Sequence, residues 1–191
     1  MPSLDDTFSK LRNRLKEGTG LRDTGDDPVY YLIFEPAKML RVKRNLRKWS
    51  SQFSIDGWNV HTLSMADVVH DALKDHPLRD FWIEGDKDDP FDFEQINETL
   101  SEALASQKAL DQRILERQDA LRDVPDALLL ITDLEAIHPY TRIGVVESRL
   151  QGQFNVPTVI LYPGDRNGTY TLSFLGIYSD DGNYRSIHIG G

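Results

Sequence analysis

Two carboxylates, a histidine and an arginine follow one apolar segment closely, at Asp133, Glu135, His138 and Arg142. The run before them, Ala-Leu-Leu-Leu-Ile, is typical of a strand buried on both faces of a parallel sheet. Ligands of open α/β sheets bind beyond the carboxyl ends of the strands, so Asp133 and Glu135 could hold a cation or act as a general base. Alternatively, they cap the next turn, Arg142 pairs with one of them, and His138 lies extended and exposed before a proline.

A carboxylate at the end of a buried strand is also a feature of the second nucleotide motif of ATPases. However, the chain has no Gly-x-x-x-x-Gly-Lys-Ser/Thr phosphate loop. The first expected strand is followed by Glu35-Pro36-Ala37-Lys38, which offers no glycine nest for phosphate and adds a negative charge. The sequence therefore predicts no nucleotide cofactor.

Other catalytic and metal-binding signatures are also missing. The chain has no cysteine, which excludes disulfides, thiol nucleophiles and thiolate metal sites. The other histidines lack the spacing that would place two metal ligands on one face: His61, His70, His76 and His188. No Gly-x-Ser-x-Gly elbow occurs. We therefore expect no metal site and no enzymatic activity.

A basic cluster in an expected helix over residues 37–53 is the sharpest local charge asymmetry. The whole chain has a net charge of −9, yet this segment contains Lys38, Arg41, Lys43, Arg44, Arg47 and Lys48. The cluster could dock an acidic partner or a phosphate backbone, or it could be a solvated face that balances the acidic loop around Asp86, Asp88 and Asp89. Because the chain as a whole repels polyanions, strong direct nucleic-acid binding is not expected.

Apolar periodicity predicts the elements that position these groups. In the first half, helices are expected over residues 4–17, 37–53 and 66–74, and strands over 29–34 and 58–63, followed by an acidic surface loop over 84–92. A helical pattern then runs from Phe93 to Leu121, which is roughly 45 Å if it is unbroken, or is interrupted near Ser106. If this helix projects, Leu110 and Ile114 form an interface; otherwise it covers one face of the sheet.

The second half predicts two buried strands, 127–131 and 156–162, joined by an amphipathic crossover helix over 140–151. Turn signals at Asn167-Gly168 and Asp181-Gly182-Asn183 predict antiparallel strands over 169–178 and 184–189. Together these segments indicate one three-layer α/β domain over residues 1–191, with a mainly parallel sheet and an antiparallel C-terminal edge. It has a P-loop-like frame that lacks the phosphate loop.

Composition agrees with an ordinary soluble protein, because 39% of the residues are hydrophobic and 28% are charged. No apolar run approaches the roughly 20 residues that cross a bilayer, so no membrane association is expected. The N-terminus, Met-Pro-Ser-Leu-Asp-Asp, is acidic and has no apolar export segment, which favours a cytoplasmic location.

Several short phrases along the chain resemble one family. They are Tyr30-Tyr-Leu-Ile-Phe-Glu-Pro36, Gly57-Trp58, Thr141-Arg142, Leu150-Gln-Gly, Val156-Pro, Leu161-Tyr-Pro-Gly164 and Tyr184-Arg185. This pattern, spread over nearly the whole chain, is similar to the BrxB proteins of bacterial BREX phage-exclusion systems. The resemblance implies a small non-enzymatic subunit that acts beside a methyltransferase, a large ATPase and the phosphatase-like PglZ protein, its expected partner. It carries no catalytic residues over to this chain.

Two function classes follow. The first is an assembly or adaptor subunit of a phage-defence complex, with Lys38, Arg41, Arg44, Lys48, Leu110 and Ile114 as docking residues. The second is a nucleotide- or metal-dependent enzyme or sensor that uses Asp133, Glu135 and Arg142. Direct DNA binding through the basic helix is a further reading, and it requires a strongly salt-dependent affinity.

Overall fold

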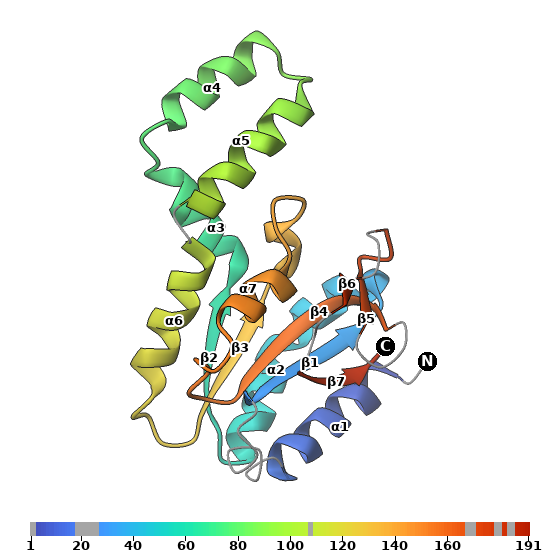
Figure 1. Cartoon of the computed structure of the whole chain (residues 1–191). Helices are drawn as coiled ribbons and strands as arrows, with labels where there is room; N and C mark the ends of the chain where they lie inside the picture. The colour runs from blue at the N-terminus through green and yellow to red at the C-terminus, as the bar shows by residue number, and fades with distance from the viewer. Residues whose placement is uncertain (1–2, 18–26, 107–108, 167–170, 178–180, 183–185) are drawn as a thin grey trace.

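Parallel strands form the centre of the computed structural model (Figure 1). The structure describes residues 3–17, 27–106, 109–166, 171–177, 181–182 and 186–191. The strands are β1 (Val29–Phe34), β2 (Asn59–Ser64), β3 (Ala127–Thr132), β4 (Thr158–Arg166), β5 (Thr171–Phe174), β6 (Asp181–Gly182) and β7 (Ile187–Gly190). The α-helices are α1 (Leu4–Glu17), α2 (Met39–Ile55), α3 (Met65–Lys74), α4 (Arg79–Asp88), α5 (Phe93–Ser106), α6 (Ala109–Leu121) and α7 (Ile143–Arg149). Two 3-10 helices, η2 (Pro36–Lys38) and η3 (Leu134–Ile137), follow β1 and β3.

The main sheet has the order β2-β3-β4-β1-β7, and each neighbouring pair is parallel. β5 pairs antiparallel with the end of β4, and β6 pairs antiparallel with β5. The predicted mainly parallel α/β class is confirmed. The sequence explains why the sheet is parallel. β1 and β3 are almost entirely apolar and every residue in them is buried, which is the pattern of strands covered on both faces.

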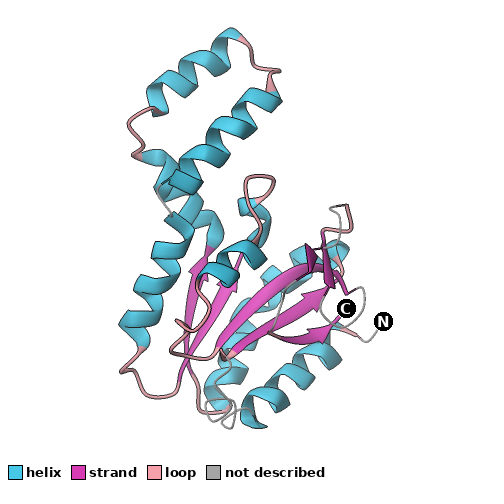
Figure 2. Cartoon of the chain, viewed as in Figure 1, coloured by secondary structure: helices cyan, strands magenta, loops and turns pink. Residues whose placement is uncertain are grey.

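Helices cover both faces of this sheet, so the fold has three layers (Figure 2). Successive β1 side chains alternate between two cores: Tyr30 and Leu32 pack with α1 and α2, whereas Tyr31 and Ile33 pack with α3, α6 and α7. On the first face, the Phe8 ring of α1 stacks on Trp49 of α2, with ring centroids 4.6 Å apart. Both helices therefore have fixed positions on the sheet.

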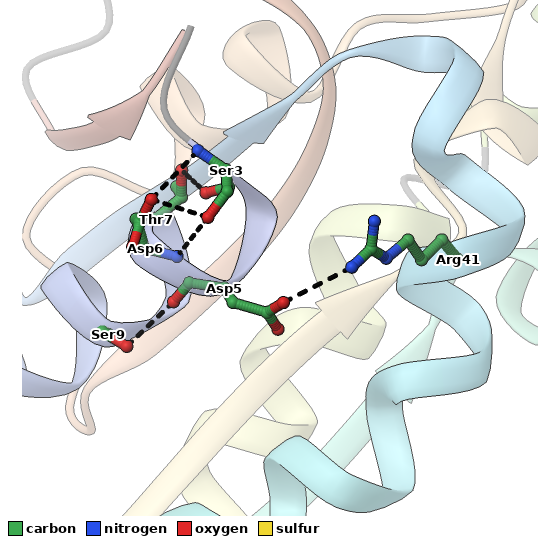
Figure 3. A network of polar contacts seen from close by, with 6 residues as sticks. All are labelled: Ser3, Asp5, Asp6, Thr7, Ser9 and Arg41. Atoms are coloured by element: carbon green, nitrogen blue, oxygen red, sulfur yellow. Dashed lines mark hydrogen bonds and ion pairs between the residues drawn. The ribbon is translucent and has the colours of Figure 1, made fainter.

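Local signals set several boundaries as predicted. α1 occupies the expected range, and its N-terminus is a capping box in which the Ser3 hydroxyl accepts from the Asp6 amide at 3.1 Å and donates to the Asp6 carboxylate (Figure 3). Ser64 caps α3 by accepting a hydrogen bond from the Asp67 amide. Gly57, at φ +99°, makes the turn into β2 that Asp56-Gly57 predicted.

The predicted antiparallel tail is only partly correct. β5 and β6 are antiparallel, but β7 pairs parallel with β1 and is an edge strand of the main sheet. Pro163 and Gly164, expected to close a strand, lie inside β4, which continues to Arg166. A side chain at position 164 would come within 2.2 Å of the Ser173 carbonyl oxygen, so glycine allows the close approach of β5. Asn167, Gly168 and Tyr184 fall outside the described residues.

The prediction of a surface loop over residues 84–92 is wrong for the first half of that segment. α4 extends through Gly85 to Asp88 and ends just before Pro90, because a proline disfavours helical backbone in the residue that precedes it. The helical pattern from Phe93 to Leu121 forms two helices and not one, since α5 ends at Ser106 and α6 begins at Ala109. Of the two alternatives, the interruption near Ser106 is therefore correct. α4 and α5 form a hairpin that projects away from the sheet (Figure 1).

Candidate functional site

Lys43 of α2 lies between the two carboxylates that follow β3. Its Nζ is 2.7 Å from Asp133 Oδ1 and 2.5 Å from Glu135 Oε1. Asp133 has left-handed backbone, with φ +59°, and its second carboxylate oxygen accepts a hydrogen bond of 2.7 Å from the Thr132 hydroxyl. A cation from the helix after β1 thus neutralises the acidic edge that follows β3.

The contacts between Lys43 and the two carboxylates also shift the pKa values of Asp133 and Lys43. Partial burial opposes ionisation of Asp133, but hydrogen bonds from Lys43, Thr132 and Ser64 outweigh it, so the pKa of Asp133 is lowered. Desolvation likewise opposes the charge on Lys43, and its two carboxylate partners overcome this and raise its pKa. Within the described part of the chain, no group of three or more metal-ligating side chains comes together. The arrangement joins α2 to the β3 exit through two ion pairs.

The two other candidates after β3 have different surroundings from those expected. Lys43, not Arg142, makes the ion pairs that the structure records at Asp133 and Glu135, and Arg142 is the N-cap residue of α7. His138 has the extended backbone that was predicted, but it is half-buried, with its ring stacked on Phe174 at a centroid distance of 3.7 Å. Burial, with a smaller contribution from the Arg142 charge, lowers the pKa of His138 to about 4.

The basic residues of α2 and η2 divide into two groups. Three are engaged within the chain: Lys38 pairs with Glu35 at 2.7 Å, Arg41 with Asp5 at 3.4 Å (Figure 3), and Lys43 with the strand-end carboxylates. The other three, Arg44, Arg47 and Lys48, are exposed and make no ion pair with any residue that the structure describes. Their charges are therefore available for a partner.

These three cations share one helix face with two exposed apolar side chains. Leu40 and Ile55 are 67% and 81% exposed, and they stand near the two ends of α2. Residues 40, 44, 47, 48, 51 and 55 recur at helical spacing on the side opposite the buried stripe of Val42, Trp49 and Phe53. We name this surface the basic α2 face, defined by Leu40, Arg44, Arg47, Lys48 and Ile55.

The prediction that Leu110 and Ile114 form an interface is wrong. Leu110 and Ile114 are 3% and 1% exposed, and both belong to the core on the α6 face of the sheet. The break after Ser106 lets α6 lie against the sheet, so its apolar stripe packs within the chain. Leu110 and Ile114 are core residues and cannot dock a partner.

The sequence reasoning missed two polar groups. Lys43 was counted only as part of the basic cluster, although it follows Met39 by four residues and so borders the apolar stripe of α2. Glu147 of α7 was not considered; its carboxylate accepts hydrogen bonds from the hydroxyls of Tyr31, at 2.5 Å, and Ser186. Burial raises the pKa of Glu147, and those hydrogen bonds oppose the shift. No local pattern marks it, since its partners come from β1 and the segment before β7.

Residues 61–189 match the model of the family described as BREX protein BrxB. This segment is more than half of the chain. The chain belongs to the BrxB family. The BrxB match starts within β2, so the basic α2 face lies before the matched segment, and the strand-end carboxylates and the α4–α5 hairpin lie inside it. Neither the curated proteins nor the solved structures give a match.

Membership of the BrxB family links the chain to BREX phage defence. None of the helices in the described ranges combines the length and the apolar character that a membrane crossing requires.

Proposed function

We propose that the chain is a cytoplasmic, non-catalytic adaptor subunit of a BREX complex and binds the PglZ-type protein of the same system through the basic α2 face. One observation carries the proposal. Arg44, Arg47 and Lys48 remain exposed and outside the ion pairs of the described chain, between two exposed apolar side chains. Such a patch offers apolar contact together with charge complementarity to an acidic surface.

The chain's electrostatics support a protein partner over a polyanion. A net charge of −9 repels nucleic acid at long range, so a basic patch on this chain is suited to an acidic protein surface of matching shape. The ion pairs of Lys43 with Asp133 and Glu135 also support the adaptor over the enzyme. Carboxylates that are already neutralised by a lysine are poor ligands for a cation and poor general bases.

Charge reversal on the basic α2 face tests this proposal. The double variant Arg44→Glu/Lys48→Glu should weaken binding to the co-expressed PglZ-type protein at least about tenfold, because two favourable contacts become repulsive. The measurement is the dissociation constant by biolayer interferometry, with circular dichroism to confirm folding. The matched control is Arg113→Glu/Arg122→Glu, which reverses two exposed charges outside the basic α2 face, one within α6 and one directly after it. Equal affinities for the wild type and the α2 variant would refute the proposal.

Calorimetry with ATP or GTP and magnesium tests the alternative reading as an enzyme or sensor. Micromolar binding that is lost in Asp133→Asn would favour that reading over the adaptor. DNA binding is tested by titration at two salt concentrations, since a phosphate-backbone interaction weakens steeply as salt rises. An affinity for DNA that depends on Arg44 and Lys48 would assign the basic α2 face to nucleic acid.

A further inference from the structure

The α4–α5 hairpin has almost no core of its own. We call residues 76–102 the arm. Between Val68 and Ala103 no residue is buried, although the segment contains Phe81, Trp82 and Ile96. The arm projects beyond the layers of the main body (Figure 1), and none of its apolar side chains is buried. Two helices alone bury little apolar surface, and exposed apolar patches of this kind mark interaction sites.

A groove lies between the two helices of the arm and the end of α3. Its volume is about 340 Å³, and its apolar lining includes Leu73, Phe81, Trp82, Ile83, Ile96 and Leu100. The Trp82 ring stacks on His76, with centroids 4.4 Å apart, which holds this side chain in place. Phe81 is 73% exposed, so it can contact a partner without any rearrangement of a core. The groove therefore presents preformed apolar contacts.

Carboxylates surround this groove. Residues 75–98 contain Asp75, Asp80, Glu84, Asp86, Asp88, Asp89, Asp92, Glu94 and Glu98, but only two cations, Arg79 and Lys87. Asp86, Asp89 and Asp92 line the groove itself, together with one of the two cations, Arg79, so the charge of its lining stays negative. Asp92 caps α5 by accepting from the Gln95 amide, whereas no carboxylate of this stretch makes an ion pair with another described residue. The arm thus combines an apolar groove with unneutralised negative charge.

We propose that the arm binds an amphipathic helix from a partner of basic character, with its apolar side chains between α4 and α5 and its lysines and arginines against the acidic rim. A third helix completes a layer that two helices leave open, and its side chains at i, i+3, i+4 and i+7 match an elongated groove. The rim selects a basic partner, because the like charges of nucleic acid or anionic lipid are repelled. This site is opposite in charge to the basic α2 face and independent of the partner proposed for it.

The probe is a synthetic 18-residue helical peptide with leucines at helical spacing and lysine or arginine at the other positions. Its control replaces each basic residue by glutamate. Fluorescence anisotropy with the full chain should give a dissociation constant for the basic peptide at least about tenfold below that of the acidic peptide. Affinity for the basic peptide should also fall as salt rises, since the rim charges are exposed.

Three variants locate the site. Phe81→Ser and Asp86→Asn/Asp89→Asn should each weaken binding of the basic peptide at least about fivefold. Both change exposed side chains, so folding is preserved, and circular dichroism checks it. Ile55→Ser is the matched control, because it removes a similarly exposed apolar side chain from the basic α2 face and should leave peptide affinity unchanged. Equal binding by wild type and both arm variants would overturn the proposal.

If the groove of the arm binds something other than a basic helix, the measurements give different results, and each of these would overturn the proposal. Self-association that Phe81→Ser abolishes, measured by sedimentation velocity, would assign the groove to a second copy of this chain. Phe81-dependent binding to phosphatidylcholine vesicles would assign it to a lipid surface. Unchanged affinity of Arg44→Glu/Lys48→Glu for the PglZ-type protein would refute the proposed function, whereas Phe81-dependent binding of the basic peptide would still support this inference, so the two proposals can fail separately.

Discussion

Lys43 of α2 and Asp133 after β3 form an ion pair of 2.7 Å that joins two elements from opposite halves of the chain. Glu135 shares the same ammonium group at 2.5 Å. The pair connects the helix that follows one central strand with the exit of another. The acidic edge of the sheet is therefore part of the structural framework.

Removal of this ammonium group should destabilise the fold. Lys43→Met leaves Asp133 and Glu135 close together without a counter-charge, and we expect a loss of about 1 kcal/mol, reduced by the partial exposure of Lys43. Urea unfolding followed by circular dichroism measures it. Lys48→Met is the control, since Lys48 is exposed and makes no ion pair with the described residues, and its effect should stay within about 0.5 kcal/mol. Equal effects of the two variants would contradict a stabilising role for Lys43.

Asp56 should make stability depend on pH in the acidic range. Hydrogen bonds from Arg12, and then from Lys16, outweigh its desolvation and lower the pKa of Asp56 from 3.8 to about 2. A depressed carboxyl pKa stabilises the fold above the unfolded value, and that contribution disappears as the pH falls towards 2. The difference in unfolding free energy between wild type and Asp56→Asn should therefore be about 1 kcal/mol above pH 4, after allowance for solvent screening, and should shrink at lower pH.

Asp119→Asn provides the comparison for that pH series. Asp119 pairs with Arg122 on the surface of α6, where both side chains are more than half exposed. Its stability difference from wild type should be small at every pH. A difference for Asp56→Asn that persists unchanged down to pH 2 would show that Asp56 does not act through its charge.

Gln118 should be among the most sensitive polar residues. It is fully buried in α6, its amide nitrogen donates to the Thr158 hydroxyl at 2.7 Å, and its oxygen accepts from the amides of Asn155 and Val156. Gln118→Leu removes the acceptor of the buried Val156 amide and the donor to the buried Thr158 hydroxyl, which keeps its bond to the Val156 carbonyl, and we expect a loss of about 3 kcal/mol in urea unfolding. The exposed Gln112→Leu on the same helix should change stability by less than about 0.5 kcal/mol. A neutral Gln118→Leu would mean that the hydrogen bonds do not stabilise the β4 entry.

Glu147 should have the opposite pH dependence to Asp56. Burial raises its pKa above 4.5, so the folded state holds the proton more tightly than the unfolded chain, and ionisation reduces stability as the pH rises. The melting temperature of Glu147→Gln relative to wild type should increase between pH 4.5 and pH 7, whatever constant offset the altered hydrogen bonds to Tyr31 and Ser186 introduce. Scanning fluorimetry across this range measures it. A difference that is flat or falls with pH would contradict a raised pKa.

The sequence predicted the elements that short-range patterns define. The stripe of Leu4, Phe8, Leu11 and Leu15 marked α1, and the apolar run of Val29–Phe34 marked β1. Both patterns appear directly in neighbouring residues: apolar side chains every three or four residues indicate a helix, and an unbroken apolar run indicates a strand buried on both faces. α4 was missed because Gly85 and the surrounding acidic residues weaken the helical signal, while its apolar side chains have no core to pack against. Apolar periodicity in the sequence therefore failed to predict α4, an α-helix in which no residue is buried.

The candidate site shows the same division. The apolar run before them placed Asp133 and Glu135 at the end of a buried strand, but sequence spacing does not reveal that Lys43 reaches them from 90 residues earlier. The tertiary structure also placed Leu110 and Ile114 in the core, and so removed them as docking residues.

The sequence by itself determined the fold class, the presence of the buried strands and the lack of a phosphate loop, since each of these is written in neighbouring residues. Only the tertiary structure decided which charges of α2 are neutralised and which stay exposed, that β7 lies parallel to β1, and that the arm leaves its aromatic residues uncovered. The physical reason is that ion pairing, strand pairing and burial join residues far apart in the chain, and their partners are selected by packing of the whole fold.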